Sequence, residues 1–360
     1  MASGYALRHL AHQGNANLQN FQDLTQVVRV DFCTEIDLFD AGVHNTIVHF
    51  AKNSPTETCR PLRVRRWGES REQFESNTDA LPTASQSKFG LTVFRRDATG
   101  CVASRSGISE LGEICYISVS MVIHCDEKKA QGLFKAEDLI SETRDKAHPK
   151  PYVEGKDILR WCVHRVRYLE YGTKRAPRMF RRPTFPQLHE AKERLLAARM
   201  CGTEPAVAFD NQQRFSNHTV IIFVPWHELR DVRNKSIKKT AKYRKEAKLS
   251  QVPAYGFRED LEELSRKFLP KYLLAVMNSS VAREFLNQRR RSKLDIYPDD
   301  WKKLPIATIP HEKQMELVRL VDRVLGEFRQ KGSPLPGDSA NRVAELEAEI
   351  NERVAALYGL

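Results

Sequence analysis

The chain has 360 residues, enough for two domains, and its hydrophobic content of 41% is typical of a protein with a folded core. No apolar run approaches the roughly 18 residues that indicate a membrane span, and the first residues lack the apolar core of a secretory signal. We therefore expect a cytoplasmic protein without a membrane partner.

The formal net charge of +12 comes from one part of the chain. Residues 151–248 hold 22 Lys and Arg against 10 Asp and Glu, whereas the rest of the chain holds 36 of each kind. A concentrated positive surface favours a polyanion such as duplex DNA, because phosphate contacts release counterions. The plainer interpretation, a basic surface that only keeps the protein soluble, stays open.

Seven cysteines are scattered through the chain, and none forms a Cys-x-x-Cys pair. An odd and scattered set fits neither a disulfide framework nor a zinc knuckle. We expect ordinary thiols in a reducing compartment and no metal-binding residues.

The first third of the chain predicts mainly strands. Apolar alternation indicates strands at residues 26–32 and 46–50, and the turn between them allows an antiparallel pair. Residues 62–66 and 89–95 also favour strands, whereas residues 69–87 are polar and typical of a loop. A longer apolar strand follows at residues 113–123, and the run His-Pro-Lys-Pro at residues 148–151 indicates a boundary.

The middle of the chain mixes both kinds of element. Strands are predicted at residues 163–169, 205–209 and 219–224, and a helix at residues 188–200, with Ala and Leu on one side and Lys and Arg on the other. Residues 236–248 predict a basic helix or an extended basic arm. The sequence thus places its positive charge next to strands that can hold it in place.

The last hundred residues are predominantly helical. Helices are expected at residues 261–264, 268–287 and 313–328, with a break at residues 332–337. The final helix places Val343, Leu346, Ile350, Val354 and Leu357 at spacings of three and four. This seam favours docking on the chain's own domain over a short coiled coil with a partner.

Signals for catalysis are absent from the sequence. It contains no Gly-x-Gly-x-x-Gly or phosphate-binding loop, no Asn/Asp-Pro-Pro-aromatic motif and no Gly-x-Ser-x-Gly elbow. Residues 298–302 (Pro-Asp-Asp-Trp-Lys) fuse two parts of a nuclease motif that a metal site needs on separate strands, so a turn and a packed Trp are favoured. Glu154-Gly-Lys156 lacks the upstream Pro-Asp, and we predict no catalytic residue.

Recognition of DNA is the remaining interpretation, since Arg reads guanine and clamps phosphate. A Pro-punctuated loop is expected to read bases, and the later basic run to contact the backbone. Asn234 in that run is equally well explained as a helix cap. The predicted DNA-binding residues are Arg175, Arg178, Arg181, Arg182, Arg230, Arg233, Asn234, Lys235, Lys238, Lys239, Arg289, Arg290, Arg291 and Lys293.

Several sequence words, taken in order, resemble a known family. They lie at residues 151–158 (PYVEGKDI), 178–185 (RMFRRPTF), 224–236 (VPWHELRDVRNKS), 271–280 (KYLLAVMNSS) and 296–305 (IYPDDWKKLP). Together they resemble the C-terminal half of adenine-specific DNA methyltransferases fused to restriction enzymes, the Type IIG kind with a TaqI-like specificity region. The similarity covers nearly the whole chain.

The resemblance implies an α+β protein and a division of labour. Residues 1–52 would be a remnant of the methyltransferase α/β sheet, 53–150 a connecting region, 151–310 the target recognition domain and 311–360 C-terminal helices. The family's cofactor and base-gripping motifs lie upstream of where this sequence begins. S-adenosylmethionine is therefore implied only for the complete enzyme, and no cofactor is expected on this chain alone.

The expected function is sequence-specific recognition of double-stranded DNA within a methylation or restriction–modification system. One alternative is adenine methylation completed in trans by a separate catalytic chain, which would be the second partner. Another is a non-catalytic remnant that oligomerises through its last helix.

Overall fold

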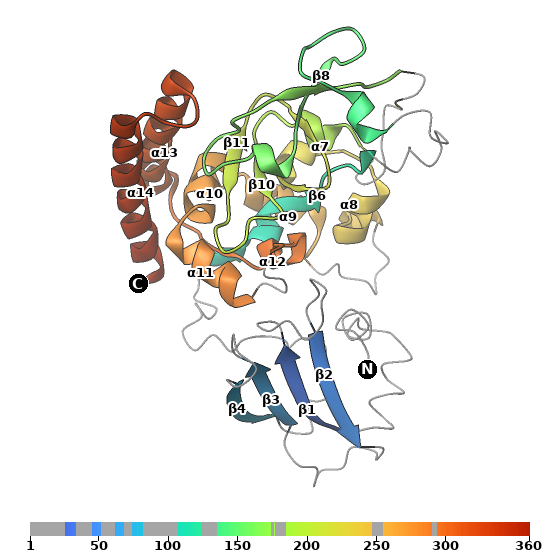
Figure 1. Ribbon diagram of the computed structural model, residues 1–360, viewed down its shortest axis with the longest axis vertical. Helices are drawn as coiled ribbons and strands as arrows, with labels where there is room; N and C mark the ends of the chain where they lie inside the picture. The colour runs from blue at the N-terminus through green and yellow to red at the C-terminus, as the bar shows by residue number, and fades with distance from the viewer. Residues whose placement is uncertain are drawn as a thin grey trace. The chain divides into compact units, whose positions relative to one another are not determined.

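The computed structural model in Figure 1 divides into two compact units, Met1–Thr99 and Gly100–Leu360. In the first unit the structure describes the backbone of residues 26–33, 45–51, 62–67 and 74–81. In the second it describes residues 107–123, 135–173, 176, 185–246, 255–289 and 294–360, the side chains of residues 288 and 289 excepted.

The first unit contains a four-stranded sheet in the order β2-β1-β3-β4. Its strands are β1 (Gln26–Cys33), β2 (Asn45–Ala51), β3 (Leu62–Trp67) and β4 (Phe74–Leu81). β1 and β2 form the expected antiparallel pair, and β1 pairs with β3 in parallel. The sequence missed β4 because its polar residues show no clear alternation; its pairing with β3 defines it. That this sheet is a methyltransferase remnant stays a prediction.

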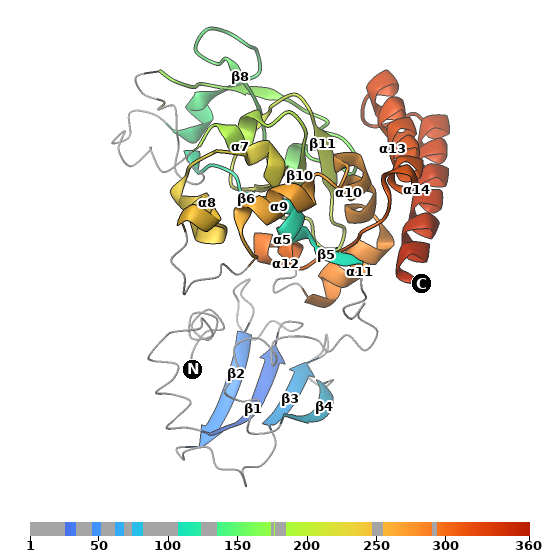
Figure 2. The same cartoon turned by 180° about the vertical axis from the view of Figure 1, so that it is seen from behind.

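The second unit is built around an antiparallel sheet in the order β11-β10-β13-β6. Its strands are β6 (Cys115–Val119), β10 (Arg194–Ala198), β11 (Val207–Asp210) and β13 (Val220–Pro225). Every residue of β13 is buried, since neighbouring strands flank it and successive side chains enter different apolar clusters on its two faces. The sheet lies in the middle of the unit (Figures 1 and 2).

The helix predicted at residues 188–200 is wrong. Only α7 (Gln187–Glu190) is helical there, and β10 follows with all its residues buried between β11 and β13. The run Arg-Leu-Leu-Ala-Ala consists of good helix formers. A strand that is buried on both faces has no alternation, so tertiary pairing overrides local preference here.

A second sheet, in the order β12-β8-β9-β7, lies between β6 and β10 along the chain, apart from β12. Its strands are β7 (Ile140–Ser141), β8 (Lys150–Val153), β9 (Arg167–Leu169) and β12 (Phe215–Ser216). β9 is shorter than the strand predicted at residues 163–169. Because β6 and β10 both run antiparallel to β13, the chain leaves the main sheet after β6, builds most of the second sheet, and returns parallel to β6.

Short elements connect the sheets. They are β5 (Ile108–Glu110), paired with β14 (Pro305–Ala307), the helix α5 (Leu111–Ile114), and the 3₁₀ helices η2 (Ala136–Leu139) and η3 (Gly155–Asp157). The predicted strand at residues 113–123 therefore begins later, after α5.

Helices form most of the last hundred residues. They are α9 (Arg258–Ser265), α10 (Pro270–Met277), α11 (Ser280–Arg289), α12 (Pro298–Lys302), α13 (His311–Lys331) and α14 (Gly337–Tyr358). The single helix predicted at residues 268–287 is two helices, separated at Asn278. The Asn278 amide donates to the Val207 carbonyl and accepts from the Val207 N–H, which ties this break to β11 (2.9 and 3.1 Å).

The last helix docks on its own unit, as the sequence favoured. Val343, Leu346, Ile350 and Val354 are buried in the cluster that also includes α10 and α13 residues. Figures 1 and 2 show α13 and α14 side by side at one edge of the unit. Among the described helices, none is long and apolar enough to cross a membrane.

Candidate nucleic-acid interface

The basic segment, residues 226–246, follows directly on the central strand β13. It comprises η4 (Trp226–Leu229), α8 (Lys235–Thr240) and η5 (Arg244–Glu246). It holds eight Lys and Arg and three Asp and Glu, a net charge of +5. Trp226, Leu229, Ile237 and Ala241 are buried in one apolar cluster, so the core anchors the segment at its start and along α8.

α8 begins at a side-chain cap. The Oδ1 atom of Asn234 accepts a hydrogen bond from the Ser236 N–H at 2.7 Å, which satisfies a free donor of the first turn. Of the two interpretations of Asn234, the helix cap is the one the geometry shows. The last turn carries Lys238 and Lys239, and positive charge there interacts favourably with the helix dipole. Both lysines are exposed, whereas the preceding residue, Ile237, is buried.

Part of the segment's charge is already paired. Lys238 lies 3.4 Å from Glu246, and Arg244 lies 2.5 Å from Asp260 on α9. Exposed pairs of this kind contribute only about 0–1 kcal/mol to stability. Arg230 lies near its neighbour Asp231. The other cations of the segment form no ion pair with any described residue; they are Arg233, Lys235, Lys239, Lys242 and Lys245.

Three further basic residues between 151 and 248 have structural roles. Arg194 and Asp210 are both fully buried and 2.7 Å apart, and Arg214 contacts the same carboxylate. Burial alone would raise the pKa of Asp210, but the charges of Arg194 and Arg214 outweigh it and lower that pKa. Arg167 pairs with Asp157 and Glu154 in the same way. Arg167, Arg194 and Arg214 are therefore not available to a ligand, unlike the exposed cations of the basic segment.

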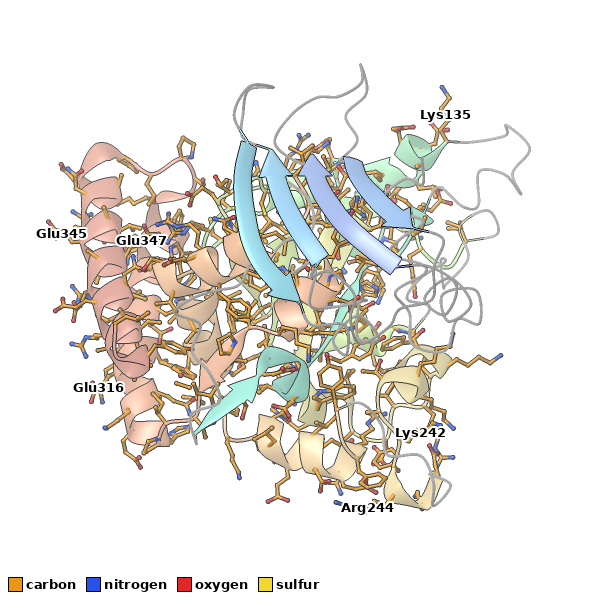
Figure 3. The ribbon with its side chains drawn as sticks, turned by 90° about the horizontal axis from the view of Figure 1, so that it is seen from below. Lys135, Lys242, Arg244, Glu316, Glu345 and Glu347 are labelled. Atoms are coloured by element: carbon orange, nitrogen blue, oxygen red, sulfur yellow. The ribbon has the colours of Figure 1, made fainter. Side chains whose placement is uncertain are left out.

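The basic segment lies on the opposite side of the unit from α13 and α14. Figures 1 and 2 show α8 at one edge and the two long helices at the other. In Figure 3, Lys242 and Arg244 lie on the side opposite Glu316, Glu345 and Glu347. α14 holds five acidic and two basic residues, a net charge of −3, so it and the basic segment carry net charges of opposite sign.

Neighbouring side chains of α9, which the sequence analysis did not identify, fix the backbone of the basic segment. Arg258 donates to the Val232 carbonyl at 2.8 Å and also to the Leu229 carbonyl. The Tyr243 hydroxyl accepts from the Asp231 N–H at 3.0 Å and donates to Glu262 at 2.7 Å. Burial and that hydrogen bond raise the pKa of Tyr243, so its hydroxyl keeps the proton that it donates. The spacing of four residues predicts that Arg258 and Glu262 share one helical face, but not that this face contacts the basic segment.

The structure brings together the predicted contacts from Arg230 to Lys239, whereas the others are not in this group. Arg289 ends α11, which lies across the unit from α8 (Figures 1 and 2), and its side chain is not described. Arg175, Arg178, Arg181, Arg182, Arg290, Arg291 and Lys293 lie outside the described residues. The base-reading role of the loop at residues 175–186 thus stays a prediction.

The two nuclease-like words are occupied by structural contacts. Asp300, in the first turn of α12, accepts from the Tyr297 N–H at 2.9 Å. Trp301 is fully buried, as predicted, but residues 298–302 form the helix α12 and not the predicted turn. Glu154 lies 3.0 Å from both Lys156 and Arg167. Within the part of the chain that the structure describes, no cluster of three or more His, Cys, Asp or Glu side chains could hold a metal ion.

No family model matches the chain, and a search of curated proteins finds no match. Solved structures with partial similarity include the Type IIL restriction-modification enzyme MmeI in complex with DNA (8% identity, TM-score 0.42), over 93% of this chain and 43% of that one. The HsdS subunit from Thermoanaerobacter tengcongensis is 12% identical with a TM-score of 0.32, over 71% of this chain and 46% of that one. The type IIG restriction endonuclease BpuSI is 10% identical with a TM-score of 0.28, over 98% of this chain and 46% of that one.

The chain thus spans about half of the length of these solved structures, or slightly less. Their TM-scores are too low to establish a shared fold.

Proposed function

We propose that the chain binds double-stranded DNA through the basic segment and serves as the sequence-reading part of a DNA methylation or restriction–modification system. The observation that carries the proposal is a group of cations without ion-pair partners among the described residues, on a segment anchored in the core. They are Arg233, Lys235, Lys239 and Lys245, which are exposed, and Lys242, which is half-buried. Cations that no carboxylate occupies are free to replace counterions on phosphate.

The finer parts of the proposal are supported by the ordered sequence words alone. They are adenine as the methylated base, S-adenosylmethionine as the cofactor of the complete enzyme, a Type IIG origin, and a catalytic half that a separate chain could supply. Selection of binders from a random duplex library at two salt concentrations tests sequence reading. An enriched motif supports it, and salt-sensitive binding without any motif contradicts it.

A salt titration of duplex binding tests the role of the basic segment. Replacing Lys235 and Lys239 together by Ala should make log K depend less steeply on log salt, by about 0.9 for each phosphate that is no longer neutralised. The affinity for cognate and random duplexes should fall alike, because phosphate contacts carry no sequence information. Fluorescence anisotropy with a labelled duplex measures both quantities.

The matched control removes the same charge elsewhere. Lys313 and Lys331 are exposed on α13, across the unit from α8. Replacing both by Ala should leave the salt dependence near the wild-type value. If the two double variants behave alike, only net charge matters and the basic segment is not the DNA contact.

Asp260→Asn should act in the opposite direction. It releases Arg244 from the carboxylate 2.5 Å away, so one more cation can reach phosphate and the salt dependence should steepen by about 0.9. Unchanged or weaker duplex binding by this variant would show that Arg244 does not face the DNA.

A further inference from the structure

One face of α9 is polar although it is buried. Arg258, Glu262 and Ser265 are exposed by only 2%, 8% and 0%, and their spacing of four and three places them on one side of the helix. Apolar residues would pack at such positions without any need for partners. Buried polar groups must be hydrogen-bonded, so the partners of these three side chains indicate what the face is for.

All three side chains bond to the basic segment. Ser265 Oγ accepts from the His227 N–H at 3.0 Å and lies 2.9 Å from His227 Nδ1. Glu262 accepts from the Tyr243 hydroxyl at 2.7 Å. Arg258 donates to the Leu229 and Val232 carbonyls and, through Nε, to Glu262 at 3.0 Å. Contacts at residues 227, 229, 232 and 243 therefore fix the segment from its start to just beyond α8.

Arg258 is the centre of this network. Its guanidinium lies 5.8 Å from the Trp226 ring centroid and 5.0 Å from that of Tyr243, so aromatic rings from the start and the later part of the segment lie against it. A planar guanidinium with fixed donor directions sets two carbonyls relative to one another, which an ammonium group on a flexible stem cannot do. The orientation of residues 229–232, which include Arg230 and lead into Arg233, depends on those two carbonyls.

The clamped turn has an unfavourable backbone. Asp231 has a φ of 60°, in the left-handed region that is unfavourable for a non-glycine residue. Its N–H donates to the Tyr243 hydroxyl at 3.0 Å. A turn of this kind persists only where its surroundings determine it, and here the surroundings are Tyr243, Glu262 and Arg258.

We infer that Arg258 is a positioning residue for the proposed DNA contact: the polar face of α9 holds the basic segment in the conformation that presents its cations to a polyanion backbone. The inference rests on the proposed function. A buried polar network often stabilises a fold less than apolar packing would, whereas a preformed binding segment loses less conformational entropy on binding. Arg258 touches no ligand in this view and acts through the main chain of residues 229–232.

The test uses the full chain with two variants, Arg258→Lys and Tyr243→Phe. Arg258→Lys keeps the positive charge and removes the planar set of guanidinium donors. Tyr243→Phe removes a single hydroxyl from a partly exposed ring. Both should bind a labelled duplex roughly fivefold or more weakly, with a salt dependence shallower by about 0.9 for each phosphate that the segment no longer reaches. Amide hydrogen exchange at residues 229–233 should quicken in both.

Arg194→Lys is the matched control, because Arg194 on β10 is also buried and also donates to main-chain carbonyls, those of Leu188 and Arg214, outside the basic segment. It should lower the unfolding temperature and leave the salt dependence of duplex binding unchanged, as should any substitution with a merely structural effect. All measurements are made where circular dichroism shows each variant fully folded. If Arg258→Lys does not fold, Tyr243→Phe decides.

The possible outcomes separate the two claims. A wild-type chain without salt-dependent duplex binding overturns the proposed function. If the wild type binds and the folded variants keep its affinity and salt dependence, Arg258 is not a positioning residue, and the proposed function stands. Weaker binding by both variants, with Arg194→Lys binding as the wild type does, supports both claims.

Discussion

His189 lies in the interior of the second unit, 2% exposed and stacked on Phe215 with ring centroids 4.6 Å apart. Neither ring nitrogen has a hydrogen-bond partner among the described residues. Burial, and then the charges of Arg194 and Lys150, lower the pKa of His189 well below its ordinary value of 6.5. The folded protein therefore contains a neutral imidazole in a site that resists protonation.

This histidine should make the free energy of unfolding depend on pH. Below about pH 6.5 the unfolded chain binds a proton that the folded chain does not. The free energy of unfolding therefore decreases as the pH is lowered, by up to about 1.4 kcal/mol per pH unit. The fall continues until the folded pKa is reached. His189→Gln should flatten this part of the profile, measured by urea unfolding between about pH 7 and pH 5.

A histidine at the surface provides the comparison. His311 is exposed at the start of α13, and His311→Gln should leave the profile as in the wild type. Should His189→Gln and the wild type become less stable to the same extent on acidification, another group would be responsible for the pH dependence.

At the scale of elements, Gly155 shows why η3 lies so close to the chain just before β13. A Cβ atom at this position would come within 2.6 Å of the Thr219 carbonyl oxygen, and the Gly155 N–H donates to Thr219 Oγ1 at 2.7 Å. Because main chain is in the way, Gly155→Ala should destabilise the protein by about 1–3 kcal/mol. Urea unfolding gives the difference directly.

The same substitution within α13 should have the opposite sign. A Cβ atom at Gly326 meets nothing within 4 Å, and Ala is favoured over Gly in a helix by about 0.5–1 kcal/mol. A Gly155→Ala protein as stable as the wild type would mean that η3 and Thr219 separate easily. Equal destabilisation at both positions would mean that backbone flexibility, not close packing, decides.

Elements whose pattern is complete within their own residues could be predicted from the sequence. The alternation of β1 and β2 and the long apolar stripes of α13 and α14 are of this kind. β10 could not be predicted, because its buried Arg194 reads as a surface residue until Asp210 is known to lie beside it. β4 is defined by its neighbour β3 and not by its own side chains.

The candidate site likewise has residues that could be predicted from the sequence and residues that could not. The basic run from Arg230 to Lys245 is visible in the sequence, since exposed charge needs no partner to be recognised. Arg258 and Glu262 could not be assigned to it, because their bonds to Val232 and Tyr243 are tertiary contacts between separate segments. The sequence also does not show which cations are paired, because the ion pair of Arg244 with Asp260 is a tertiary contact as well.

Across the whole second unit, charge is distributed unevenly. The basic segment carries a net charge of +5 and α14 a net charge of −3, on opposite sides of the unit (Figures 1 and 2). A charge distribution of this kind orients the unit as it approaches a polyanion and raises the association rate at low salt. The described apolar clusters all lie between Leu111 and Tyr358, within this same unit.

A fragment of residues 100–360 should therefore fold and bind duplex DNA alone. Its main thermal transition should lie within a few degrees of that of the full chain, and its salt dependence should match, because the basic segment and its α9 clamp are both included. Calorimetry and anisotropy of the two proteins give the comparison. A fragment that folds but does not bind would assign part of the DNA contact to residues 1–99.

The parallel return from β6 to β10 has a consequence for how such a protein diversifies. Residues 120–193 leave and rejoin the main sheet on strands that pair with β13, and they include the loop predicted to read bases. The basic segment follows β13 and lies outside this excursion. Recombination that exchanges the excursion, while keeping apolar residues at Val153, Ile158 and Leu188 against the sheet, would leave the proposed phosphate contacts unchanged. If the proposed function holds, a lineage would then acquire a new sequence preference in one genetic step and keep its affinity for DNA.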